Sequence, residues 1–73
     1  MSTLVALGEP VRLDAFSLAG VRVIPAETAA DARAAWTALA PDVAVVILSS
    51  TAQKAIEDLL PSRPDVIWTT IPD

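Results

Sequence analysis

Short aliphatic runs alternate with helical patterns along this chain, and glycine or proline bounds nearly every segment. The aliphatic runs are Leu4–Leu7, Val21–Ile24, Val43–Leu48 and Val66–Ile71. The segments between them place apolar residues at helical spacing. Within 73 residues, this alternation predicts one α/β domain spanning 1–73, with a parallel sheet and right-handed crossovers.

Capping signals mark the expected helix boundaries. Pro10 suits the first turn of a helix that begins at Val11, and Gly20 is the residue expected just past its end. A second helix is expected to reach about Ala40, and a third about Leu60. Two residue pairs resemble capping boxes at the starts of these helices: Thr28 with Asp31, and Ser50 with Gln53.

The strand compositions predict the order of the sheet. The first and third runs are entirely aliphatic and suit central strands, which are covered on both faces. Arg22 in the second run, and Thr69 and Thr70 in the fourth, suit edge strands. The predicted fold is a flavodoxin-like three-layer αβα domain with strand order 2-1-3-4 and three helices. Right-handed crossovers leave the sheet bare beside the first helix, over strands 3 and 4.

Composition disfavours several functional classes. The chain has no cysteine and no histidine, which removes thiolate chemistry, the commonest general base and the usual zinc ligands. Its net charge is −4 and its five basic residues are scattered, so a nucleic-acid partner is not expected. The longest aliphatic run has six residues, whereas a spanning helix needs about 20. We therefore expect no membrane insertion and a cytoplasmic location.

The loops at the expected switch point, Gly8–Pro10 and Ser49–Thr51, favour neither catalysis nor a cofactor. A phosphate cradle needs several glycines, and Glu9 would repel a phosphate. Ser49 occupies the position where a receiver domain carries its phosphoacceptor aspartate. No catalytic, cofactor-binding or metal residue is therefore predicted. The alternative kept open is a degenerate receiver-like or small-ligand-sensing domain that uses this cleft.

The helices suggest a partner surface instead. The first helix has Leu13 and Phe16 on one side and a second apolar set on the other, and the second helix carries an outward alanine stripe. The high helix propensity of alanine is the favoured explanation of the stripe, and close packing of a partner helix is the alternative. The bare sheet face is a further candidate, through which the chain could form a homo-oligomer. The candidate interface residues are Val11, Ala15, Leu18, Ala30, Ala34 and Ala38.

Four segments resemble the F-subunit family of the V-type (A/V-type) rotary ATPases, in the same order along the chain. These are the strand end Ala6–Glu9, the segment Phe16–Val21, the third strand Val46–Leu48 and the pair Ile71–Pro72. Phe16–Val21 reads Phe-Ser-Leu-Ala-Gly-Val, close to the Phe-x-Leu-Ala-Gly helix end of that family. The resemblance implies a four-stranded parallel sheet of the same kind.

The resemblance also implies a function. A member of that family is a non-catalytic part of the central rotor stalk, peripheral to the membrane in the soluble ATPase sector. It binds the coiled-coil D-type stalk protein among the other V-type ATPase subunits. Two features depart from the family. Ser49–Thr51 replaces the usual Thr-Glu-Asp, and these 73 residues hold no counterpart of the family's C-terminal helix after Ile-Pro.

Overall fold

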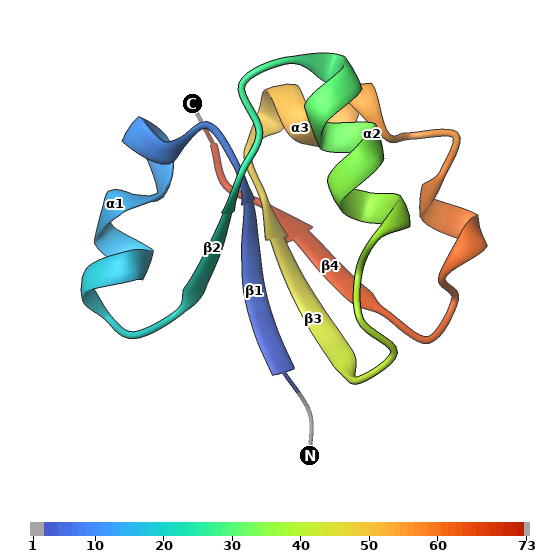
Figure 1. Cartoon of the computed structure of the whole chain (residues 1–73), viewed down its shortest axis with the longest axis horizontal. Coiled ribbons are helices and arrows are strands. Elements are labelled where there is room, and N and C mark those ends of the chain that lie inside the picture. The colour runs from blue at the N-terminus through green and yellow to red at the C-terminus, as the bar shows by residue number, and fades with distance from the viewer. Residues whose placement is uncertain (1–2, 73) are drawn as a thin grey trace.

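The computed structural model describes residues 3–72, in which four parallel strands form one sheet in the order β2-β1-β3-β4 (Figure 1). The aliphatic strands β1 and β3 are central and the more polar β2 and β4 are edges, which confirms the predicted flavodoxin-like order. The strands are β1 (Thr3–Gly8), β2 (Arg22–Pro25), β3 (Val43–Leu48) and β4 (Ile67–Thr70).

The helices cover the two faces of the sheet unequally. Figure 1 shows α1 on one side and α2 with α3 on the other, the arrangement that right-handed crossovers predict. The α2 and α3 side holds most of the buried core, to which β1 contributes Val5 and Leu7. Since strand side chains alternate, Leu4 and Ala6 face α1. The helical segments are α1 (Pro10–Leu18), α2 (Ala29–Thr37), α3 (Ser50–Ala55) and the 3₁₀ turn η1 (Leu60–Ser62).

Gly20 lies just past the end of α1, as predicted. The N–H of Gly20 donates to the carbonyl of Ser17 at 3.0 Å, and that of Val21 to the carbonyl of Phe16 at 2.9 Å. These are the two bonds of a Schellman motif. Gly20 has a φ of 89°, which glycine adopts without the steric cost that a Cβ would bring.

Of the two predicted capping pairs, Thr28 with Asp31 is confirmed in its N-cap residue, Thr28. Thr28 Oγ1 accepts the N–H of Asp31 at 3.0 Å and begins α2. The prediction for α3 was wrong by one residue, because its cap is Ser49 and not Ser50. Ser49 Oγ accepts the N–H of Ala52 at 3.2 Å. The helix starts one residue earlier because β3 ends at Leu48 and turns directly into α3.

The expected end of α3 near Leu60 was also wrong, since the regular helix stops at Ala55. Side chains of α2 donate hydrogen bonds to backbone carbonyls at and after this point. Arg33 Nη1 donates to the carbonyl of Ala55 at 3.2 Å, and Trp36 Nε1 to that of Leu59 at 3.0 Å. The chain continues as turns into η1, whose Pro61 has no N–H to extend an α-helix.

Candidate functional site

The carboxyl ends of β1 and β3 meet at the switch point, where Ser49 is fully buried. Its hydroxyl donates to Glu9 Oε1 at 2.7 Å and accepts the N–H of Ala52. Arg12 approaches the other Glu9 oxygen at 3.6 Å, so Glu9 is not the isolated carboxylate that the sequence suggested. Ser49 therefore joins the two loops and caps a helix. Its hydroxyl is fully buried and both of its hydrogen bonds join parts of the fold, which suits a structural role.

Gly8 allows the two loops to approach each other this closely. A Cβ added at Gly8 would lie 2.7 Å from Ser49 Cβ and closer still to Ser49 Oγ. Both contacts are well inside van der Waals distance, and the φ of Gly8 is 153°. Gly8 thus serves the packing of β1 against Ser49, and not the wrapping of an anion.

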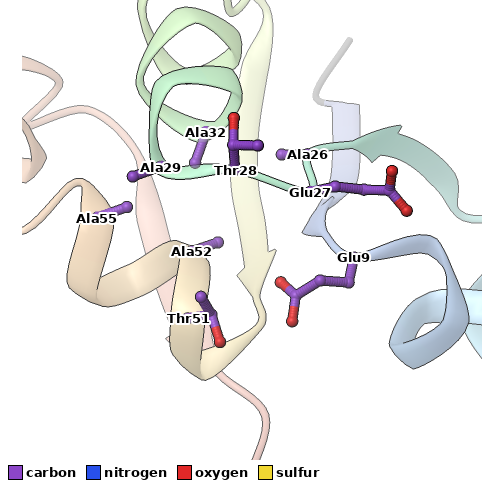
Figure 2. Close-up of a pocket in the computed structure, with 9 residues that line it drawn as sticks. All are labelled: Glu9, Ala26, Glu27, Thr28, Ala29, Ala32, Thr51, Ala52 and Ala55. Atoms are coloured by element: carbon purple, nitrogen blue, oxygen red, sulfur yellow. The ribbon is translucent and has the colours of Figure 1, made fainter.

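A small cleft lies beside this loop, between the first turns of α2 and α3 (Figure 2). Its volume of about 10 Å³ admits roughly one water molecule. Figure 2 shows the Glu9 carboxylate directed toward α3 and the Glu27 side chain directed away from it. A negative charge and so little space suit neither a phosphate nor a nucleotide. Its lining residues are Glu9, Ala26, Glu27, Thr28, Ala29, Ala32, Thr51, Ala52 and Ala55.

A larger cavity of about 150 Å³ lies at the opposite end of the sheet, where the sequence indicated nothing. The register of β1 against β3 shifts there between Thr3 and Leu4. Thr3 Oγ1 donates to Asp42 at 2.5 Å, and this bond holds the pKa of Asp42 below its ordinary value. No sequence signal marks the irregular register. The lining residues are Thr3, Val5, Arg22, Ile24, Ala38, Leu39, Ala40, Asp42 and Val43.

The structure resolves which side of α1 faces outward. Leu13 is fully buried, and Phe16 is half-buried beside it. On the opposite side Val11 is 80% exposed, Leu18 is 90% exposed and Ala15 is also exposed. The second apolar side of α1 is therefore exposed at the surface of the domain.

The alanine stripe belongs to a different surface. Ala30, Ala34 and Ala38 are all exposed along α2, whose inward residues are Ala32 and Trp36. Because α2 and α1 lie on opposite faces of the sheet (Figure 1), the structure does not bring the two candidate sets together.

The α1 side of the sheet is partly uncovered. α1 packs against β1 and β2. The strand register places five side chains on the rest of this face: Leu4, Val45, Ile47, Ile67 and Thr69, here named the open sheet face. Ile67 is 71% exposed and Leu4 42%, whereas Val45 and Ile47 are half-buried. The bare surface expected from the crossovers is present, chiefly at β4.

Charged side chains pair across the α2 and α3 face. Arg33 donates two hydrogen bonds to Asp58, of 2.7 and 3.1 Å, and Arg63 pairs with Asp65 at 3.1 Å. The hydrogen bond from Arg33 lowers the pKa of Asp58, and that from Arg63 lowers the pKa of Asp65. Both pairs are solvent-exposed, so their effect on stability is small and sensitive to salt.

Acid should weaken the Arg33–Asp58 pair. A carboxyl with a lowered folded-state pKa stabilises the fold above its unfolded pKa of about 4, and this contribution is lost as the pH falls through the folded value. The unfolding free energy of the wild type should therefore converge on that of Asp58→Asn between pH 6 and pH 2. Urea titrations at several pH values measure this. Arg33→Gln should remove the same pH dependence, and parallel profiles for wild type and Asp58→Asn would contradict the assignment.

Taken together, these features define a flavodoxin-like α/β domain whose switch point is filled by its own side chains and whose apolar surfaces lie on α1 and the open sheet face. Comparisons with protein-family models, curated proteins and solved structures find no match. Across residues 3–72, no group of three or more acidic side chains is placed to hold a metal ion. In the same range, no helix has the length and apolar character required to cross a bilayer.

Proposed function

We propose that this chain is a non-catalytic protein-interaction domain whose partner covers the outer side of α1. The observation that carries the proposal is the exposure of Leu18 (90%) and Val11 (80%) on a helix whose other side is already packed. Apolar side chains gathered on one face of a small domain favour association with an apolar partner surface. The open sheet face lies on the same side of the sheet and extends the apolar area.

A helix is the partner element that suits this side. In α/β domains each sheet face is covered by helices, and here α1 occupies only the part over β1 and β2. A second helix beside α1 would bury Ile67 and Leu4, and burial contributes roughly 25 cal/mol per Å² of apolar surface.

The particular assembly we propose is the central stalk of a V-type rotary ATPase, with the coiled-coil D-type stalk protein as the helical partner. The resemblance of Phe16–Val21 to the F-subunit pattern supports this assignment, and the observed strand order is the one that the resemblance implies. Such a protein works by binding and carries no catalytic group, which agrees with the structural commitment of Ser49. The domain would then lie in the soluble sector of the enzyme, peripheral to the membrane.

Calorimetry with the purified coiled-coil stalk protein of the same organism's V-type ATPase tests both the interaction surface on α1 and the stalk assignment. The double variant Val11→Ser, Leu18→Ser should weaken binding tenfold or more, since exposed apolar anchors dominate such contacts. Its stability should change by less than about 0.5 kcal/mol, because both residues are exposed. Ala34→Gln tests the α2 stripe and should bind as the wild type does.

The outcomes distinguish the stalk assignment from the location of the interface. A wild-type domain that does not bind the coiled coil would refute the stalk assignment. Binding that survives the α1 double variant and fails with Ala34→Gln would move the interface to α2.

A further inference from the structure

The outer edge of β4 carries backbone groups that no other strand within residues 3–72 pairs. The N–H of Ile71 donates to the carbonyl of Leu48 at 2.8 Å, so the peptide groups of Ile71 point toward β3. In a parallel ladder these directions alternate, and Thr69 therefore also faces β3. The N–H and C=O groups of Trp68 and Thr70 point away from the sheet. They form a row of donors and acceptors whose natural partner is another strand.

No charged side chain within β4 opposes pairing, although the strand is short, with four residues. Native edge strands are commonly protected by charges, by bulges or by covering segments. The segment from Val66 to Pro72 has no charged residue, although Asp65 and Asp73 flank it in the sequence, and Asp65 pairs with Arg63 at 3.1 Å. Ile67 is 71% exposed on one face of the strand and Trp68 is 40% exposed on the other. The strand itself is thus apolar on both sides and uncharged, whereas the chain as a whole carries a charge of −4.

We propose that β4 is the contact of a symmetric dimer, in which the β4 strands of two copies of this chain pair antiparallel across a two-fold axis. The outward groups determine the register. Trp68 of each copy lies opposite Thr70 of the other, which forms four backbone hydrogen bonds. Thr69 faces its own counterpart on the axis, and Ile67 lies opposite Ile71. Threonine pairs and aliphatic pairs are both favourable cross-strand neighbours.

The neighbouring registers are excluded by the residues that flank β4. A shift toward the C-terminus would set Trp68 opposite Pro72, which has no N–H to donate. A shift toward the N-terminus would set Thr70 opposite Val66, whose N–H already donates to the carbonyl of Arg63 at 3.0 Å. The central register is the one that satisfies every outward group. A second copy fits better than a charged peptide, because this edge offers no side chain of opposite charge.

Single-cysteine variants test the register directly, because the chain has no cysteine of its own. Across the axis, two residues at position 69 form a non-hydrogen-bonded pair with Cα atoms about 4.5 Å apart, within disulfide reach. Thr69→Cys should therefore form a disulfide-linked dimer on mild oxidation. Ile67→Cys should remain largely unlinked, since the two copies of position 67 are displaced by four residues, about 13 Å. Because Ile67 is highly exposed, contact through the open sheet face would link Ile67→Cys as readily as Thr69→Cys.

A backbone variant tests the hydrogen bonds. Thr70→Pro removes an outward N–H and leaves the bonds to β3 in place, so by symmetry the dimer loses two of its four backbone bonds. Its dissociation constant should rise tenfold or more. Thr70→Val keeps the N–H and should dimerise as the wild type does.

Sedimentation equilibrium measures these constants, and circular dichroism verifies that each variant is folded. A wild type that remains monomeric at hundreds of micromolar would overturn the proposal. Equal disulfide yields at positions 67 and 69 would also overturn it. These readouts do not involve the coiled-coil partner, so they are independent of the proposed function.

Discussion

Trp36→Ala is expected to be the most destabilising single substitution in the domain and to remove a large share of its unfolding free energy. Trp36 is the largest fully buried side chain, and its ring lies between α2 and the segment that follows α3. Truncating a buried tryptophan costs about 3–5 kcal/mol. A 73-residue domain has a total stability of roughly 4–11 kcal/mol. The loss is therefore a large share of what holds the fold together.

Trp36→Phe separates the polar part of this effect from the packing. Trp36 Nε1 donates to the carbonyl of Leu59 at 3.0 Å and to Ser62 Oγ at 3.2 Å, and phenylalanine removes both bonds. We expect a loss of about 1–3 kcal/mol. The matched control is Trp68→Phe, at a position 40% exposed, which should change stability by less than about 0.5 kcal/mol.

Urea unfolding followed by circular dichroism, at low micromolar protein, compares the three tryptophan variants without depending on tryptophan emission. Equal losses for Trp36→Phe and Trp68→Phe would contradict the packing described here.

Gly8→Ala should be the second most damaging change. Its new methyl group would collide with the Ser49 side chain, which is itself fixed by Glu9 and by the N–H of Ala52. Relieving the clash requires movement at the centre of the sheet, where overpacking costs about 1–3 kcal/mol, in addition to the strain of the backbone.

Gly20→Ala is the control for the loss of a glycine as such. Gly20 has a positive φ of 89° but open space around it, so alanine there should cost about 1–2 kcal/mol of backbone strain only. Urea midpoints of the two variants give the comparison. The double variant Gly8→Ala, Ser49→Ala should regain part of the loss, because it removes the hydroxyl involved in the clash. An unchanged midpoint for Gly8→Ala would show that the loops approach each other less closely than described.

Local signals in the sequence were enough to predict the sheet. The aliphatic segment Val43–Leu48 indicated a central strand, and Gly20 and Thr28 marked helix boundaries through bonds within a few residues. The order 2-1-3-4 followed because composition and the handedness of the crossovers agreed.

The errors lie where distant residues decide the local structure. The side chains of Arg33 and Trp36, more than twenty residues earlier, donate to the carbonyls of Ala55 and Leu59 at and after the end of α3. The cavity near Asp42 lies beside a shift of strand register that leaves no compositional trace.

For α1 the sequence predicted two apolar sides and left open which of them faces outward. In the structure every residue of the candidate interface set is exposed. The set nevertheless combines two surfaces, because Leu18 on α1 and Ala34 on α2 lie on opposite faces of the sheet (Figure 1). Periodicity tells which side of a helix is apolar, and only the assembled sheet tells which helices share a face.

The helices are held to the sheet with very different strength. Arg33 and Trp36 tie α2 to the chain beyond α3 by side-chain hydrogen bonds, whereas α1 has Leu13 as its one fully buried side chain. Free energies of local opening differ across a native protein, and α1 belongs at the low end of that range. The proposed partner surface therefore lies on the part of the fold that opens most readily. A partner that covers Val11 and Leu18 would raise the free energy needed to open α1. The measured binding free energy would then include the cost of ordering this helix.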